Sequence, residues 1–177
     1  MDVYGHHASV CAVKGDRIKR HNLIRDIIFD FCYAAAWASS KEKPHLFPHT
    51  SERPADVFVP NYSFGKDLVL DVAVTCPLQH KYLYGASVTA GFACNEYAVH
   101  IKQKNYQDWV EQESFVYLPF ILESFGGFSS DVSEFIHRLS SNVGTRFNES
   151  KSSIAKNIYE MISCVLNLVG VNKLIKI

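Results

Sequence analysis

The sequence predicts an α/β domain in which helices surround one small sheet. The expected elements follow one another as helix, strands, helix, strand and two helices, an order typical of a layered α/β or α+β architecture. The stretch 68–74 is apolar on both of its faces, which is typical of a strand covered on both sides. A chain of 177 residues with 47% hydrophobic and 13% aromatic content is long enough for one domain with a sizeable core. The same composition excludes disorder over most of the chain.

The first expected helix covers residues 21–38 and is followed by a loop. Its apolar residues recur at helical spacing and predict one buried face, made of Leu23, Ile27, Phe31, Ala34 and Ala38 with Ile24, Ile28 and Ala35 beside them. Three prolines and a Ser-Ser pair then predict a loop over residues 39–55.

Two strands joined by a turn are expected next. Residues 57–59 are strand-forming, and we expect Pro60 to end this strand because proline has no N–H for a sheet hydrogen bond. Residues 61–67 predict a turn with Gly65 at positive φ. In the strand 68–74, the side chain of Asp71 lies among apolar neighbours, so we expect it to have a partner or a metal ion.

The second half of the chain predicts three helices and one strand. A helix of small residues is expected from about residue 85 or 86 to residue 106. A strand follows over residues 115–122, and Pro119 within it indicates an edge or a bend. Amphipathic patterns predict the last two helices, near residues 130–142 and 150–169.

The charges sum to zero but are unevenly distributed. Residues 1–25 hold five Lys or Arg against two Asp, whereas residues 105–137 hold six acids and no Lys or Arg. A neutral sum argues against a protein that coats nucleic acid without specificity, but it allows a local basic site. Affinity for isolated DNA is then expected to be weak and to fall steeply with salt.

Several classes of protein are excluded by simple patterns. No run approaches the roughly 18 apolar residues of a membrane span, and residues 1–25 lack the apolar core of a secretory signal. The five cysteines are widely spaced and odd in number, so we expect reduced, mostly buried thiols in an intracellular protein.

Two aspartates form the central candidate site. Asp56 directly precedes one predicted strand, and Asp71 lies within the next. Two carboxylates on adjacent strands suit one Mg²⁺ or Mn²⁺, which takes oxygen ligands, and such an ion promotes phosphodiester hydrolysis. A lysine nearby would stabilise the charge that develops on the phosphate. The alternative is that Asp56 caps a loop and Asp71 forms a salt bridge in a purely structural domain.

The chain resembles the restriction-like, or PD-(D/E)XK, endonuclease domain that follows the reverse transcriptase of LINE-type retrotransposons. The resemblance runs from about residue 6 to residue 139 and depends on the order and spacing of short motifs. The matching stretches are His7-Ala8-Ser9-Val10-Cys11, Arg20-His21-Asn22, Arg53-Pro54-Ala55-Asp56, Leu70-Asp71-Val72-Ala73-Val74, Lys102-Gln103-Lys104-Asn105-Tyr106 and the segment 118–127.

The resemblance implies a role for each matching residue. Asp56, Asp71 and the backbone carbonyl of Val72 would hold the metal ion. The catalytic lysine would be Lys102 or, as second candidate, Lys104; the two lie about 200° apart on a helix and cannot both reach the site. Substrate would be bound by the remaining matched residues, Arg20, His21, Arg53 and Tyr106.

The chain also departs from the family pattern at several positions. Ala73 stands where the lysine of Asp-x-Lys is expected, Ala55 separates the proline from Asp56, and Asn22 replaces an acid. His7 and Cys11 have the spacing of half a zinc knuckle, and tetrahedral structural zinc needs four ligands. We therefore expect residues 1–19 to be a truncated, zinc-knuckle-like segment.

The resemblance gives two hypotheses of function and a domain plan. We expect a restriction-endonuclease-like domain with a small mixed sheet at residues 20–142, and a C-terminal helical segment packed on it at residues 143–177. The first hypothesis is a retroelement-derived, nuclear, Mg²⁺- or Mn²⁺-dependent DNA endonuclease, with a reverse transcriptase domain upstream in the same polyprotein. The second is an inactive remnant that binds nucleic acid or protein.

Overall fold

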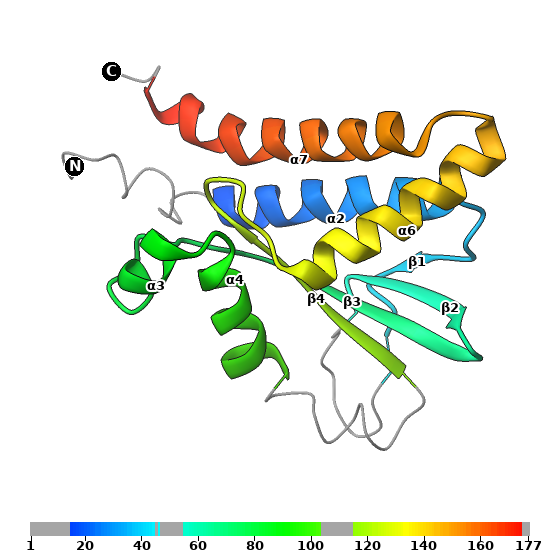
Figure 1. Ribbon diagram of the computed structural model, residues 1–177, viewed down its shortest axis with the longest axis horizontal. Coiled ribbons are helices and arrows are strands. Elements are labelled where there is room, and N and C mark those ends of the chain that lie inside the picture. The colour runs from blue at the N-terminus through cyan, green and yellow to red at the C-terminus, as the bar shows by residue number, and fades with distance from the viewer. Residues whose placement is uncertain (1–14, 45, 47–54, 104–114, 175–177) are drawn as a thin grey trace.

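A four-stranded mixed sheet forms the centre of the computed structural model, which describes residues 15–44, 46, 55–103 and 115–174 (Figure 1). The strand order is β1-β2-β3-β4. Strands β1 to β3 pair in antiparallel fashion, and β3 and β4 pair in parallel. The strands are β1 (Ser40–Lys41), β2 (Val57–Ser63), β3 (Lys66–Thr75) and β4 (Phe115–Glu123). The predicted α/β class with one small mixed sheet is therefore confirmed.

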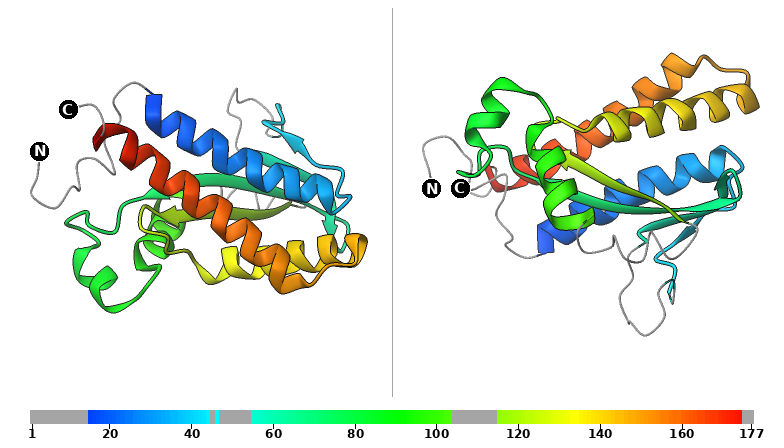
Figure 2. Two further views of the ribbon diagram at one scale, coloured as in Figure 1. Left: turned by 90° about the horizontal axis from the view of Figure 1, so that it is seen from above. Right: turned by 60° about the horizontal axis from the view of Figure 1, so that its bottom comes forward.

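Helices cover both faces of the sheet. One face carries α2 (Asp16–Ala34), α6 (Ser130–Phe147) and α7 (Lys151–Leu174). The segment between β3 and β4 forms α3 (Leu83–Val88), α4 (Phe92–Tyr97) and the π-helical η2 (Ala98–Gln103). Of these, α4 and η2 lie against the opposite face, on β4 (Figure 2). No helix of the described residues is long and apolar enough to cross a membrane.

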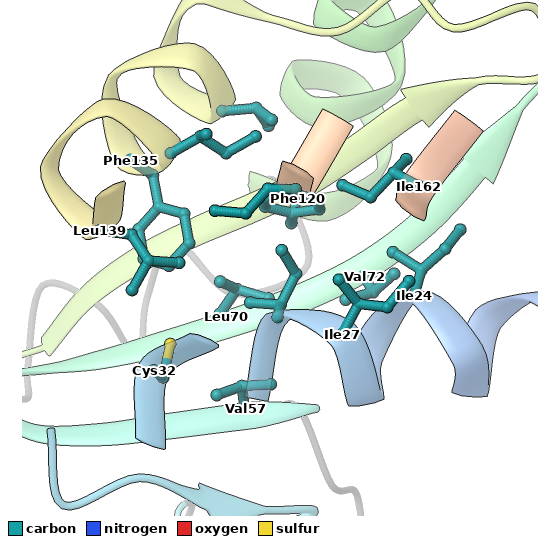
Figure 3. Close-up of a cluster of buried hydrophobic side chains, with 14 of the residues drawn as sticks. Ile24, Ile27, Cys32, Val57, Leu70, Val72, Phe120, Phe135, Leu139 and Ile162 are labelled. Atoms are coloured by element: carbon teal, nitrogen blue, oxygen red, sulfur yellow. The ribbon is translucent and has the colours of Figure 1, made fainter. Parts of the chain in front are cut away.

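The main hydrophobic core lies between the sheet and the layer of three helices (Figure 3). Leu70 and Val72 of β3 and Phe120 of β4 point towards this layer, and each is at most 2% exposed. Alternate residues of a strand point to opposite faces, so Asp71 between them points away from this core. Burial of this face thereby orients Asp71 towards α4 and η2.

Helix α2 buries most of the predicted face, but it begins earlier than expected, at Asp16, and ends at Ala34. Ile24, Ile27 and Ile28 are buried as predicted and Cys32 joins them, whereas Leu23 is 46% exposed. The buried side of the helix is therefore rotated slightly from the predicted one. The four residues predicted to form the inner face of α6, by contrast, are all buried: Val132, Phe135, Ile136 and Leu139.

Strand β2 continues through Pro60, where the sequence predicted its end. Its regular pairing with β3 stops at Val59 and resumes only at Ser63. Pro60 thus lies in an irregular part of the ladder. No regular sheet hydrogen bond is lost there, although proline has no N–H to donate. The predicted turn is correspondingly shorter and is centred on Phe64 and Gly65, both at positive φ.

The single helix predicted near residues 85–106 is instead divided into α3, α4 and η2. Gly91, at the N-cap of α4, has φ 77°, and this left-handed conformation interrupts the helix. A Cβ at this position would lie 2.5 Å from the carbonyl oxygen of Phe128. Glycine is therefore favoured at this position for two reasons: its φ is positive, and there is no space for a Cβ.

The end of the chain forms a helical hairpin. Helix α6 continues through the boundary expected at residue 142, and α7 packs on both α2 and α6. Strand β4 lies at the sheet edge, as Pro119 predicted, and Pro119 pairs with Asp71. The segment 1–19 lies largely outside the described residues.

Candidate functional site

Asp71 and Lys102 form a largely buried ion pair on the face of the sheet that α4 and η2 cover. Lys102 Nζ lies 2.7 Å from Asp71 Oδ2 and 3.0 Å from Oδ1. The side chain of Asp71 is only 9% exposed and that of Lys102 is 20% exposed. Tyr117 of β4 donates a further hydrogen bond of 2.9 Å from its hydroxyl to Asp71 Oδ2. The predicted partner of Asp71 is thus a lysine supplied by the following helical segment.

The pKa of Asp71 is raised above its ordinary value. Burial is the largest cause, because the charged carboxylate loses hydration. The positive charge and hydrogen bond of Lys102 oppose this rise, whereas the negative charge of Asp56 adds to it. The two aspartates are therefore close enough to repel each other, and a cation between them would relieve that repulsion.

Asp56 directly precedes β2, and its side chain is held by two hydrogen bonds. His21 of α2 donates from Nε2 to Oδ1 at 3.0 Å, and the backbone N–H of Val72 donates to Oδ2 at 2.7 Å. The hydrogen bond to Asp56 is the largest cause of a raised pKa for His21, and burial opposes it. The bond from Val72, the residue after Asp71, fixes the two aspartates relative to each other.

The buried face of α4 and η2 explains why Lys102 reaches the site. Cys94 and Ala98 lie one helical turn apart and pack on Ile121 of β4. Lys102 follows Ala98 by four residues and continues this face over the sheet. Glu96 and His100 have exposed side chains that lie 3.4 Å apart, measured between Oε2 and Nε2, so the part of the predicted stripe that they form faces solvent. Lys104 itself lies outside the described residues.

Glu123 anchors the start of α4 and was not predicted from the sequence. Its carboxylate accepts a hydrogen bond of 3.0 Å from the backbone N–H of Ala93, in the first turn of the helix. Glu123 is only 6% exposed, and a Cβ on Gly127 would overlap its carboxylate. A buried acid at a helix N-terminus stabilises the free N–H groups there. This contact fixes α4, and with it the segment that carries Lys102.

A cleft of about 510 Å³ adjoins the two aspartates. Arg17, Arg20 and His21 line it from α2, and Val72 and Ala73 line it from β3. His21 and Val72 are also the two hydrogen-bond donors to Asp56, so the cleft and the site share residues. Arg20 is 6% exposed, and burial is the largest cause of its lowered pKa. The small side chain of Ala73 stands where the lysine of Asp-x-Lys was expected.

The structure brings together most of the residues predicted for the site. Asp56, Asp71, Val72, Lys102 and His21 form one connected set of contacts. Tyr117 belongs to this set and was not predicted, although it lies in the predicted strand 115–122. Arg20, also predicted, lines the adjoining cleft. The other predicted residues fall outside the described part of the chain: Arg53, Lys104 and Tyr106, together with His7 and Cys11 of the knuckle-like segment.

The oxygen donors that a cation could use at this site are the carboxylates of Asp56 and Asp71 and the carbonyl of Val72. Among the described residues, no group of three or more His, Cys, Asp or Glu side chains is arranged to hold a metal. Mg²⁺ commonly uses one or two carboxylates and keeps several waters, so two carboxylates are a donor set of the kind it takes.

No protein-family model and no curated protein matches this chain. The α/β class with a four-stranded mixed sheet follows from the observed strand pairing, whereas the restriction-endonuclease-like fold stays a prediction. The chemistry of Asp56, Asp71 and Lys102 is accordingly inferred from their geometry.

Proposed function

We propose that the chain is a nuclease-like domain that hydrolyses DNA phosphodiesters in a reaction dependent on Mg²⁺ or Mn²⁺. One observation carries the proposal: Lys102 Nζ lies 2.7 Å from Asp71, and the next residue, Val72, donates its N–H to the carboxylate of Asp56. Paired carboxylates with a nearby lysine are a set of groups suited to phosphoryl chemistry. The restriction-like fold is part of the same proposal, supported by helices on both faces of a small mixed sheet.

The residues of the site divide the work between them. Asp56, Asp71 and the Val72 carbonyl would hold the metal, which supplies Lewis-acid stabilisation of the phosphate and an activated water when bound. Lys102 places a positive charge where negative charge develops on the phosphate oxygens. His21 and Tyr117 orient Asp56 and Asp71, respectively, through their hydrogen bonds. Because Asp71 is largely buried, little water competes for its contacts, and their geometry is fixed.

The resemblance to the retrotransposon domain extends the proposal to partners. It favours DNA as substrate, a reverse transcriptase domain upstream in the same polyprotein, and action in the nucleus. The arginines that line the adjoining cleft, Arg17 and Arg20, support an anionic substrate.

An inactive remnant that binds nucleic acid is the second candidate function. Two observations favour it. Ala73 replaces the lysine of Asp-x-Lys, and all four carboxylate oxygens of Asp56 and Asp71 already contact protein donors. A carboxylate oxygen accepts more than one hydrogen bond, so these contacts weaken the case for catalysis without removing the donor set.

A plasmid-nicking assay tests the proposal. The purified chain is incubated with supercoiled plasmid and Mg²⁺ or Mn²⁺, beside the variants Asp71→Asn and Lys102→Met. The matched control is Lys156→Met, which removes a lysine from an exposed ion pair with Glu160 on α7. We expect nicking by wild type and control, and loss of at least about 100-fold in both site variants.

The outcomes separate the two functions. Equal nicking by wild type and Asp71→Asn would show that the activity does not come from this site. If the wild type binds DNA but does not nick it with either metal, the inactive remnant is the correct description.

A further inference from the structure

The ammonium group of Lys102 contacts both carboxylate oxygens of Asp71. Its Nζ lies within hydrogen-bonding distance of each, at 3.0 Å from Oδ1 and 2.7 Å from Oδ2. The hydroxyl of Tyr117 donates a further hydrogen bond to Oδ2 at 2.9 Å. The proposed Mg²⁺ or Mn²⁺ site takes its Asp71 ligand from these same oxygens. A divalent cation and the Lys102 ammonium group therefore need the same atoms.

Two cations at one buried carboxylate repel each other strongly. The side chain of Asp71 is only 9% exposed and that of Lys102 is 20% exposed, so little water screens the charges between them. The negative charge of Asp56 acts on Asp71 as well. An ion that interacts with both carboxylates gains from both charges, whereas the Lys102 ammonium group contacts Asp71. The pair of aspartates thus favours the divalent cation over the lysine.

The end of the segment that carries Lys102 is held by few buried contacts. Glu123 anchors the start of α4, but Lys102 lies near the end of the π-helical η2 that follows. Among the described side chains of η2, only Ala98 is buried, and Val99 and Ile101 are clearly exposed. Elements with few buried contacts open at low cost, and π-helical turns occur frequently at functional sites. Lys102 can therefore leave Asp71 while the core of the sheet stays packed.

We propose that Lys102 and the divalent cation compete for the carboxylate of Asp71, and that binding of the cation releases the Lys102 ammonium group towards the substrate. The inference rests on the proposed nuclease function, because it requires a metal ion at Asp56 and Asp71. Lys102 then has two successive partners, the carboxylate of Asp71 and the phosphate. Its charge becomes available to the phosphate only when the cation is in place, so metal binding regulates the lysine.

A titration with Mn²⁺, followed by electron paramagnetic resonance, tests the competition without reference to cleavage. The full chain is compared with Lys102→Met, Lys102→Gln and Lys102→Arg, and the matched control is Lys156→Met from the exposed pair with Glu160. We expect Lys102→Met and Lys102→Gln to bind Mn²⁺ at least about tenfold more tightly than wild type, because a competing charge is removed. Lys102→Arg keeps the charge, and it should bind Mn²⁺ no more tightly than wild type, as should the control. Lys102→Gln retains a hydrogen-bond donor beside Asp71, so it tests the proposal even if Lys102→Met does not fold.

Urea denaturation in the presence of Mn²⁺ gives a second readout. A ligand stabilises the folded protein in proportion to the logarithm of its affinity once its concentration exceeds the dissociation constant. A tenfold gain in affinity then corresponds to about 1.4 kcal/mol of additional stabilisation. We expect Mn²⁺ to stabilise Lys102→Met by at least this much more than wild type. The double variant Asp71→Asn with Lys102→Met should lose this gain, and its retention would place the Mn²⁺ elsewhere and overturn the proposal.

The outcomes separate this inference from the nuclease proposal. If the wild type binds Mn²⁺ and nicks DNA but Lys102→Met and Lys102→Gln bind Mn²⁺ no more tightly, the competition is overturned and the nuclease proposal stands. Tighter binding by Lys102→Arg as well would show that the charge does not compete, and would also overturn the inference. If the two neutral variants bind Mn²⁺ more tightly but the wild type never nicks DNA, the competition stands and the nuclease proposal fails. If no form of the chain binds Mn²⁺, both fail.

Discussion

Replacement of Lys102 by methionine should destabilise the protein strongly at neutral pH. The change removes the ammonium group that contacts both oxygens of Asp71, whose side chain is only 9% exposed. Removing one partner of a buried ion pair costs about 3–5 kcal/mol of stability, because the charge of the other partner stays buried and uncompensated. The Tyr117 hydroxyl still donates to Asp71, and the carboxyl gains a proton more readily. We therefore expect a loss of about 2–3 kcal/mol at pH 7.

The pH dependence of this loss identifies its cause. Burial already raises the pKa of Asp71, and removal of Lys102 raises it further. As the pH falls, the carboxyl of the variant takes up a proton before that of the wild type, and the cost of the buried charge decreases. The difference in stability between wild type and variant should therefore shrink as the pH falls, in metal-free buffer.

Urea denaturation in EDTA at pH 7 and pH 5 measures both effects. The control Lys156→Met removes an exposed pair at 3.7 Å, and its expected cost is only about 0.3–0.5 kcal/mol. The double variant Asp71→Asn with Lys102→Met should be more stable than Lys102→Met alone, because no charge stays unpaired. A loss in Lys102→Met no larger than that of the control, or one that grows as the pH falls, would refute the buried-pair account.

Three further predictions concern the core, the helix start and the His21 contact. Phe120→Ala, in the fully buried core, should cost about 3–5 kcal/mol in urea denaturation; a cost below about 1 kcal/mol would contradict the packing described. Gly91→Ala should cost at least about 2 kcal/mol, because its φ is 77° and its Cβ would lie 2.5 Å from the Phe128 carbonyl oxygen. Since the hydrogen bond to Asp56 raises the pKa of His21, its stabilising effect should be full below the unfolded pKa and lost as the pH rises through the folded pKa. His21→Gln should remove this part of the pH dependence in EDTA, and an unchanged profile would show that His21 does not cause it.

The sequence predicted those features of the fold that local patterns encode. The strand around Asp71 and the inner face of α6 follow from alternation and helical spacing, and both are observed. The buried face of α2 was predicted in part: Ile24, Ile27 and Ile28 are buried as expected, whereas Arg20 is buried and Leu23 is exposed. Packing on the sheet sets the exact rotation of this helix.

The candidate site, too, was predicted where local patterns encode it and missed where it depends on tertiary packing. Asp71 was recognised because a carboxylate within an apolar strand needs a partner, and Lys102 was one of two lysines expected to serve. Choosing between them required the helix face that packs on Ile121, which is a tertiary feature. Tyr117 and Glu123 come from β4, and the parallel pairing of β3 and β4 brings them to the site. No short-range pattern predicts that pairing.

Mn²⁺ binding tests most directly the proposal that Asp56 and Asp71 together hold one metal ion. The measurement is an electron paramagnetic resonance titration of the full chain with Mn²⁺, in wild type, Asp71→Asn and the control Glu160→Gln at an exposed position of α7. We predict one Mn²⁺ site in wild type and control and its loss in Asp71→Asn. Equal binding in wild type and Asp71→Asn, or no bound Mn²⁺ in wild type at millimolar concentration, would contradict the claim.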